Sequence, residues 1–256
     1  MKLIVNGDDF GITRACNYAI IDCYKYGFLT STSMMTNMPG FPHAVELMKE
    51  YPDLSVGIHL NLTVGKPLTK DLKTLVNADG NLNKDAMNKD AVVDPEEIRK
   101  EVTAQFDYFV ELTGQLPTHI NSHHGIEMIP GAEAIQLQLA KKHQLPVRRF
   151  FTLPQGNHPD SDYVIPNMCL IMKEDWSIPI EPEDIINFFN DDMLKSDDIY
   201  ELAAHPGYVD YELMQLSSLT NARCNDAYNF MCDELKDWIK ANDIELVTYS
   251  QIPLKG

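Results

Sequence analysis

The sequence predicts an α/β protein built as a single distorted TIM-like barrel with about seven parallel strands. Short apolar runs of the strand type alternate with longer runs of the helix type along all 256 residues, which is typical of parallel strands joined by crossover helices. The length suits one large domain of this class. Strand and helix signals continue in the same style throughout, so we expect residues 1–256 to form one domain.

The predicted strands are short segments rich in apolar and β-branched residues. They lie at 2–6, 29–36, 54–62, 118–122, 147–153, 199–204 and 244–249. Seven parallel strands fit a barrel, and the last strand can close the sheet near the first.

Three helices are predicted between the strands. The first covers 13–26, where apolar residues recur at helical spacing and Gly27 follows. The second starts after Asp94, which precedes a proline, and ends at Gly114. The third covers 231–241. The segments 63–93 and 155–182 fit neither pattern, and long irregular segments of this kind are usually functional loops.

The charge balance excludes two classes of partner. Lys and Arg total 21 against 38 Asp and Glu, a net charge of −17 that repels nucleic-acid phosphates and anionic lipids. The apolar start of the chain is too short for a signal-peptide core, and no segment approaches the roughly 20 apolar residues of a membrane span. We therefore expect a cytoplasmic protein that binds a small molecule rather than nucleic acid or a membrane.

Acidic residues and histidines follow four of the predicted strands. They are Asp8 and Asp9 after the first strand, His59 near the end of the third, His123 and His124 after the fourth, and His205 after the sixth. The carboxyl ends of barrel strands form one face, so we expect these side chains to converge there. Each motif alone also has a structural explanation, as a helix cap, a core histidine or a turn.

A converging set of this kind predicts a catalytic metal site. Two imidazole nitrogens and one carboxylate oxygen can hold a divalent ion and leave positions open for water and substrate. Such an ion acidifies a water and polarises a carbonyl oxygen, which favours amide or ester hydrolysis. The pair Asp8-Asp9 allows one carboxylate to bind the ion while the other takes a proton. Because successive strand residues point opposite ways, we expect the pair to lie in a turn, which Phe10-Gly11 supports.

These motifs resemble those of the YdjC-like carbohydrate deacetylases. They read NGDDFG at 6–11, GIHLNL at 57–62, GKPL at 65–68, PTHINSHH at 117–124 and HPGY at 205–208. The resemblance covers the whole chain. It implies a TIM-like barrel, a divalent metal such as Mg²⁺ or Zn²⁺, and removal of N-acetyl groups from N-acetylglucosamine-containing oligosaccharides. Diacetylchitobiose or its 6-phosphate, a role in chitin degradation and a homodimer are further implications of the resemblance.

The resemblance also implies residue roles by motif position. Asp9, His59 and His123 would be the metal ligands. Asp8 would be the general base, and His205 would be the acid that protonates the departing amine.

The sequence departs from the family pattern close to these ligands. Asn121 stands where an aspartate is common, and Gly125 and Glu127 lie where further histidines are common. Residues around the ligands orient the metal-binding histidines, so we expect these departures to affect the surroundings of the ion and the substrate preference.

Further residues are candidates for contact with the sugar. They are His124, Tyr163, Trp176, Tyr208 and Arg148. The aromatic side chains could offer flat faces to sugar rings, and Arg148 or its neighbour Arg149 could make a forked contact with a sugar phosphate. Core or surface packing for the aromatic residues, and a surface salt bridge for either arginine, are the alternatives.

Two alternatives to a deacetylase stay open. The first keeps the metal but changes the reaction, giving a phosphoesterase or an isomerase, because barrels host many chemistries. The second is a catalytically inactive sugar-binding or metal-binding regulatory protein. Acetate release from N-acetylated sugars separates the first alternative from a deacetylase, and the effect of Asp8→Asn on turnover separates the second.

Overall fold

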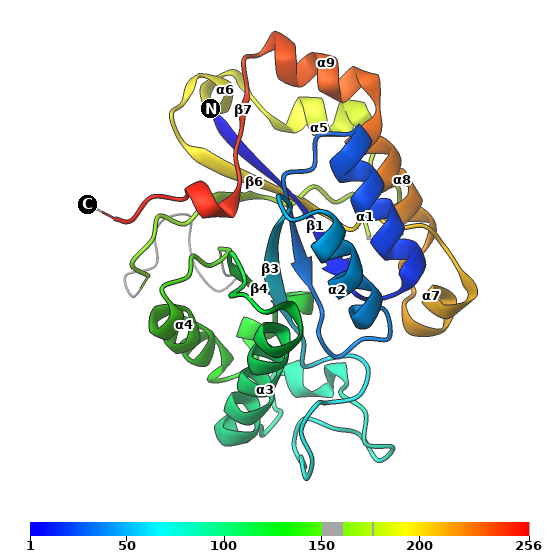
Figure 1. Cartoon of the computed structure of the whole chain (residues 1–256), viewed down its shortest axis with the longest axis vertical. Coiled ribbons are helices and arrows are strands. Elements are labelled where there is room, and N and C mark those ends of the chain that lie inside the picture. Colours follow the sequence, from blue (N-terminus) through cyan, green and yellow to red (C-terminus); the bar gives the residue numbers. More distant parts are fainter. Residues whose placement is uncertain (150–160, 176, 256) are drawn as a thin grey trace.

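Parallel strands and helices alternate along the computed structural model, which describes residues 1–149, 161–175 and 177–255 (Figure 1). The strands are β1 (Lys2–Phe10), β2 (Ser31–Met34), β3 (Ser55–Leu60), β4 (Ile120–Ser122), β5 (Asn167–Cys169), β6 (Ile199–Ala204) and β7 (Glu245–Leu246). The α-helices are α1 (Arg14–Tyr26), α2 (Phe41–Glu50), α3 (Pro95–Thr113), α4 (Ala132–His143), α5 (Pro182–Phe188), α6 (Asp191–Lys195), α7 (Tyr211–Leu216), α8 (Asn221–Met231) and α9 (Asp233–Ala241). Three short 3-10 helices complete the set, η1 (Lys84–Met87), η2 (His123–Met128) and η3 (Tyr249–Gln251).

The strands form one parallel sheet that curls into a half-barrel. Its order is β4-β3-β2-β1-β6-β5, and β7 pairs with the start of β1. The α/β class and a sheet of seven strands in the described part of the chain agree with the sequence prediction. The closed barrel does not, because the edge strands β4 and β5 do not pair with each other within the described residues. Both edge strands are only 3 residues long, too short to complete a ring.

The predicted strand at 147–153 is wrong as far as the described residues test it. Val147 forms a single parallel bridge with Ile120, and the prediction from residue 150 onward lies outside the described residues. Strand β5 was not predicted, because it is short and lies in a segment with four prolines that reads as a loop. The other six predicted strands coincide with β1, β2, β3, β4, β6 and β7.

Local capping signals account for the two helices that the sequence predicts best. Helix α1 follows Thr13, whose hydroxyl accepts a hydrogen bond from the backbone of Cys16. Helix α3 follows Asp94, and Gly114 ends it in a left-handed conformation with φ 74°. The third predicted helix corresponds to α9. Helices α2 and α4 to α8 were not predicted, although some have local caps, such as the capping box of Glu181 and Asp184 at α5 and the Asp210 cap at α7.

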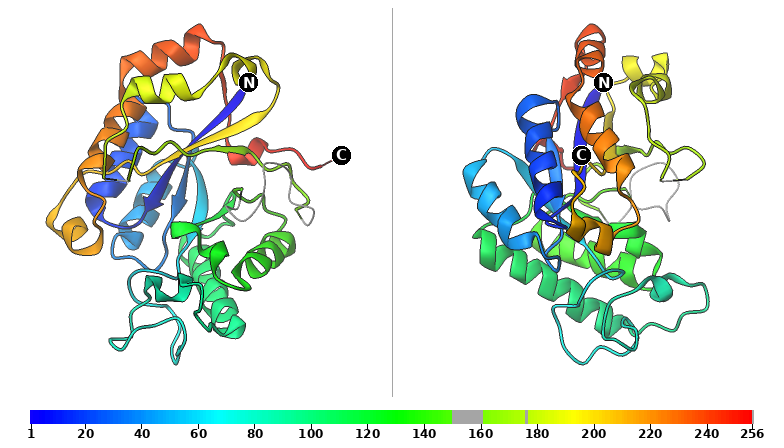
Figure 2. Two further views of the ribbon diagram at one scale, coloured as in Figure 1. Left: turned by 180° about the vertical axis from the view of Figure 1, so that it is seen from behind. Right: turned by 90° about the vertical axis from the view of Figure 1, so that its right-hand side faces the viewer.

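The two faces of the sheet have different chemistry. Leu3 and Val5 of β1 belong to the large apolar cluster under the helices, and Figures 1 and 2 show α1 and α2 along that side. Alternate residues on β1 point to the other face. There Ile4 packs with residues of the C-terminal segment, including Tyr249, and Asp8 follows at the carboxyl end of the strand. The inner face therefore changes from apolar to polar toward the site.

Helix α3 anchors the long irregular segment that follows β3. The carboxylate of Glu101 accepts hydrogen bonds from the backbone of Leu68 and Thr69, at 3.0 Å each. One turn earlier, Glu97 accepts bonds from the backbone of residues 73–75. One turn later, Gln105 exchanges two bonds with the backbone of Asn61. Side chains spaced four residues apart on one helix face therefore fix a segment that has little regular structure of its own.

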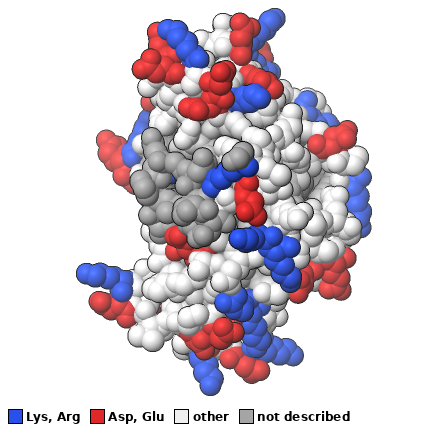
Figure 3. Space-filling view, turned by 90° about the vertical axis from the view of Figure 1, so that its left-hand side faces the viewer, with Lys and Arg blue, Asp and Glu red and all other residues white. Residues whose placement is uncertain are grey.

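Charged side chains do not gather by sign on the face shown in Figure 3. Acidic and basic residues are interspersed there, although the whole chain carries a net charge of −17. Among the helices of the described ranges, none combines the length and the apolar character that a membrane crossing requires.

Gly57 on β3 makes room for a ring stack inside the curled sheet. The imidazole of His119 lies flat against the ring of Tyr249, with centroids 3.7 Å apart and planes at 12°. A Cβ atom on Gly57 would lie 2.3 Å from Cε1 of His119. Because the same ring stacks on Tyr249, moving it away from a new Cβ atom would disturb the stack.

We predict that Gly57→Ala lowers the free energy of unfolding by about 3 kcal/mol, because overpacking a closed interior forces side chains and backbone apart. Urea unfolding of the two proteins measures this. Gly80→Ala is the control: Gly80 has φ 74° with no atom near its Cβ position, and we expect it to cost only about 1 kcal/mol of backbone strain. Equal costs at both positions would contradict the packing argument.

Candidate metal centre

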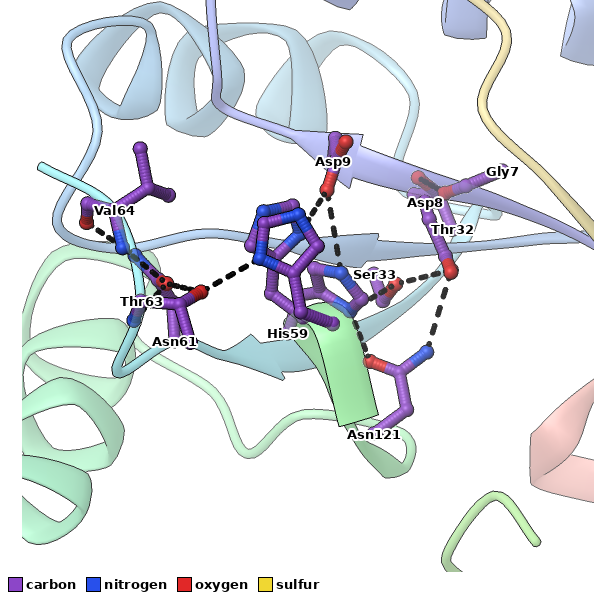
Figure 4. Close-up of polar contacts among 12 residues, drawn as sticks. Gly7, Asp8, Asp9, Thr32, Ser33, His59, Asn61, Thr63, Val64 and Asn121 are labelled. Carbon is purple, nitrogen blue, oxygen red and sulfur yellow. Dashed lines mark hydrogen bonds and ion pairs between the residues drawn. The ribbon is translucent and has the colours of Figure 1, made fainter. Parts of the chain in front are cut away.

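Three buried side chains from three strand ends meet at one point. Asp9 Oδ1 lies 3.2 Å from Nε2 of His59 and 3.0 Å from Nδ1 of His123. These atoms all lie within 4.8 Å of one another. Figure 4 shows Asp8 and Asn121 on one side of the Asp9–His59 pair. The structure thus brings together the three residues that the sequence motifs proposed as ligands.

An irregularity at the end of β1 turns both neighbouring aspartates toward the site. The pairing register of β1 with β2 shifts between Gly7 and Phe10, and Asp9 has φ 68°. A left-handed residue inside a strand interrupts the alternation of side chains, as a β-bulge does. The prediction of a turn after the strand is wrong, because β1 continues to Phe10. The bulge, and not a turn, lets both carboxylates face the site.

The three facing atoms fit a bound cation. Asp9 Oδ1, His59 Nε2 and His123 Nδ1 are all buried, and none has a hydrogen-bond partner among the described residues. Buried polar atoms are rarely left in this state, and three of them at one point suit a divalent ion with carboxylate and imidazole ligands.

The hydrogen bonding of His59 is compatible with a role as ligand. Its Nδ1 lies 2.7 Å from Oδ1 of Asn121, so Nδ1 carries the proton and Nε2 keeps its lone pair for the ion. In the opposite orientation of the amide, the Asn121 nitrogen would face Nδ1 and the oxygen would accept from Arg148. The imidazole proton would then lie on Nε2, so binding of an ion through Nε2 requires the first orientation.

Asp8 is held in its ionised form beside the centre. Arg148 donates to both carboxylate oxygens, from Nη1 to Oδ2 at 2.6 Å and from Nη2 to Oδ1 at 2.7 Å. Asn6 and Ser33 also donate to Oδ1. Burial alone would raise the pKa of Asp8. Arg148 and His59 together lower the pKa by more than burial raises it, so it lies well below its usual value.

Arg148 does not lie where a substrate phosphate contact was expected. Arg148 is only 6% exposed, and its guanidinium makes the forked contact with Asp8. The same guanidinium donates to Oε1 of Glu201, whose other oxygen accepts from the hydroxyl of Tyr249. A buried polar chain therefore runs from Asp8 down the inside of the sheet.

His205 lies at the carboxyl end of β6, next to the two aspartates. Burial lowers the pKa of its imidazole to about 4, while Asp9 and Asp8 oppose this by raising it. Its backbone nitrogen donates to Oδ2 of Asp226 at 3.0 Å. Burial raises the pKa of Asp226 to about 6, against the opposing effects of the His205 backbone bond and of Arg223.

The residues proposed to contact sugar are found in different places. His124, with φ 58°, is exposed, and its ring lies 3.7 Å from that of His123. Tyr208 is 36% exposed, and its hydroxyl donates to Asp22 of α1. Tyr163 packs against the apolar cluster at the amino-terminal half of β1, away from the centre. Trp176 lies outside the described residues.

Sequence reasoning missed two charged residues of the site. Arg223 of α8 donates from Nη2 to Oδ2 of Asp9 at 2.7 Å. Glu201 of β6 binds Arg148 from a fully buried position. A charged residue in the middle of an apolar strand, on the same face as His205, is a signal that could have identified Glu201. Arg223 has no comparable signal, because α8 itself was not predicted.

The fold and the site together define an α/β protein with a candidate single-ion centre at the carboxyl ends of its parallel strands. The family model described as YdjC-like protein matches residues 2–241, and the chain belongs to the YdjC-like family. The family expected from the sequence motifs is therefore confirmed.

The chain is similar over its whole length to named relatives. A protein named carbohydrate deacetylase from Clostridium beijerinckii is 37% identical over 257 residues, which cover 98% of this chain and 100% of the relative. Carbohydrate deacetylase 2 from Listeria innocua is 35% identical over 272 residues, with 100% of both chains covered. A crystal structure from Enterococcus faecalis of a proposed cellobiose-phosphate cleavage protein superimposes with a TM-score of 0.84, at 29% identity and over 97% of each chain.

We predict a pH-dependent difference in stability between the wild type and Asp226→Asn. The carboxyl pKa is raised from 3.8 to about 6 in the folded protein, so its favourable contribution is complete below about pH 4 and is lost as the pH rises through 6. The free energy of unfolding of the wild type, measured against the variant, should fall by up to about 3 kcal/mol between pH 4 and pH 7. Urea unfolding at several pH values measures this, and a difference that stays constant with pH would refute it.

Proposed function

We propose that this protein is a metal-dependent carbohydrate deacetylase that hydrolyses the N-acetyl amide of small N-acetylglucosamine-containing oligosaccharides. The proposal rests on the convergence of Asp9, His59 and His123 beside a second carboxylate, with buried ligand atoms that have no hydrogen-bond partner in the part of the chain that the structure describes. The relatives named carbohydrate deacetylase support the substrate class. Diacetylchitobiose and its 6-phosphate are the substrates we propose to test first.

Asp9, His59 and His123 would hold the ion, with Asp9 as the anionic ligand. When bound, a divalent ion supplies Lewis acidity toward the acetyl carbonyl and toward water.

Asp8 would accept the proton of the attacking water. Its Oδ1 has several hydrogen-bond donors, whereas among the described residues Arg148 alone donates to Oδ2, so Oδ2 is the oxygen with room for a proton. The ion pair with Arg148 keeps Asp8 charged before the reaction, but it also makes the carboxylate a weak base. Asp8 would therefore hold the proton only briefly and pass it on through His205 to the departing amine, so that the protein neither gains nor loses a proton overall.

His205 would return a proton to the departing amine. Its pKa of about 4 means that the protonated imidazole, once formed, gives its proton up readily. The negative charges of Asp8 and Asp9 favour the protonated form during the reaction. The net change is that water cleaves the amide into acetate and a free amine on the sugar.

We predict that the protein releases acetate from N-acetylated oligosaccharides and that a chelator stops the release. Acetate would be measured on a panel of substrates, with and without a phosphate group, before and after chelation and with Mg²⁺ or Zn²⁺ added back. Absence of acetate from every substrate in the metal-loaded protein would refute the proposal. Phosphate release without acetate would favour the phosphoesterase alternative.

We predict that Asp8→Asn lowers kcat by about 100- to 10,000-fold, the usual contribution of a general base. The affinity for the ion, measured by calorimetry, should stay within about threefold of the wild type because Asp8 is not one of the three facing ligands. Asp79→Asn in the exposed loop after β3 is the matched control and should leave kcat unchanged. Full activity in Asp8→Asn would exclude this residue as the base.

A further inference from the structure

The two oxygens of the Asp9 carboxylate face different partners. Oδ1 is directed at the two ligand histidines, 3.2 Å from His59 Nε2 and 3.0 Å from His123 Nδ1. Oδ2 is 2.7 Å from Nη2 of Arg223 and accepts a charge-assisted hydrogen bond from it. A carboxylate with one oxygen occupied in this way presents a single oxygen to an ion.

Arg223 is itself fixed from several directions. It is only 1% exposed, and its Nε donates to the backbone oxygen of Leu219 at 2.9 Å. Its own backbone oxygen accepts from the nitrogen of Gly207 at 3.0 Å. A Cβ atom on Gly207 would lie 3.2 Å from Cδ of Arg223, so the glycine lets the two chain segments approach closely. The guanidinium is therefore a buried group held at Nε by Leu219 and at Nη2 by Asp9, while Nη1 has no hydrogen-bond partner among the described residues.

Asp9 needs such an anchor. Its φ of 68° is a left-handed conformation that costs a residue with a side chain about 1–2 kcal/mol. Rotation of the carboxylate would bring either one oxygen or both toward the histidines. The bond from Arg223 selects one of these arrangements, because it can form only when Oδ2 points away from the ligand histidines.

We propose that Arg223 is a positioning residue for the metal ligand Asp9, which it holds so that Oδ1 alone binds the ion. This inference rests on the metal site of the proposed function but not on the identity of the substrate. It assigns a separate arginine to each of the two neighbouring aspartates: Arg148 holds Asp8, and Arg223 holds Asp9. Loss of Arg223 should therefore act on ion binding itself.

The direction in which ion affinity changes when Arg223 is replaced distinguishes a positioning role from a purely electrostatic one. Removing a cation close to a cation site would by Coulomb attraction and repulsion alone strengthen ion binding. Removing a partner that orients a ligand instead weakens binding, by about 10- to 100-fold for such residues. The proposal requires the second outcome.

The test measures the affinity of chelator-treated protein for Zn²⁺ and Mg²⁺ by calorimetry in Arg223→Met. We expect affinity about 10- to 100-fold below that of the wild type. Arg223→Gln, which keeps a shorter hydrogen-bond donor, should lose less than Arg223→Met and gives a second measurement if the methionine variant does not fold. Circular dichroism verifies the fold of each variant.

Arg148→Met is the matched control, since it removes an equally buried arginine from the other aspartate. Its ion affinity should not fall by more than about threefold, well short of the loss expected for an orienting partner of a ligand. Unchanged or tighter binding in both folded Arg223 variants would overturn the proposal. A wild-type protein that binds neither ion would remove both the metal site and this inference. A wild type that binds the ion but releases no acetate would refute only the deacetylase activity.

Discussion

Two adjacent carboxylates, Asp8 and Asp9, are buried together at the end of β1, and the surrounding structure is arranged to keep both of them ionised. Burying one unpaired charge is already unfavourable, and two neighbouring charges of the same sign repel each other strongly. Each aspartate is therefore paired with its own arginine, and Asp9 also faces two imidazoles. The site depends on this balance more than on any single contact.

Charge compensation also explains why the inside of the curled sheet is polar over part of its length. Arg148 carries one positive charge but lies between Asp8 and Glu201, and the second oxygen of Glu201 is satisfied by Tyr249. Tyr249 in turn stacks on His119, which occupies the space left by Gly57. The need to neutralise Asp8 at the strand ends therefore constrains residues farther inside the sheet, down to Gly57. This is expected where buried polar groups must all find partners.

Local signals in the sequence predicted the parts of the molecule that depend on neighbouring residues. Caps and helical spacing located α1 and α3, and strand-end motifs located Asp9, His59 and His123. The predicted approach of the last strand to the first is confirmed by the pairing of β7 with β1, but the sequence did not show that the sheet stops at a half-barrel, because edge pairing depends on how far the sheet curls and not on any one strand. The ion pairs of Arg148 and Arg223 join residues 140 and 214 positions apart, so no local pattern reports them.

The anchoring of the loop after β3 by helix α3 has a consequence for how this rim can change. Glu97 and Glu101 bind main-chain amides, which every amino acid except proline offers, and each also accepts from one side-chain hydroxyl of the loop, Thr74 for Glu97 and Thr69 for Glu101. Exposed positions between 66 and 75 other than Thr74 can therefore be exchanged while the backbone path stays the same. These exposed side chains of the loop can therefore change in evolution without a change in the backbone that α3 holds in place.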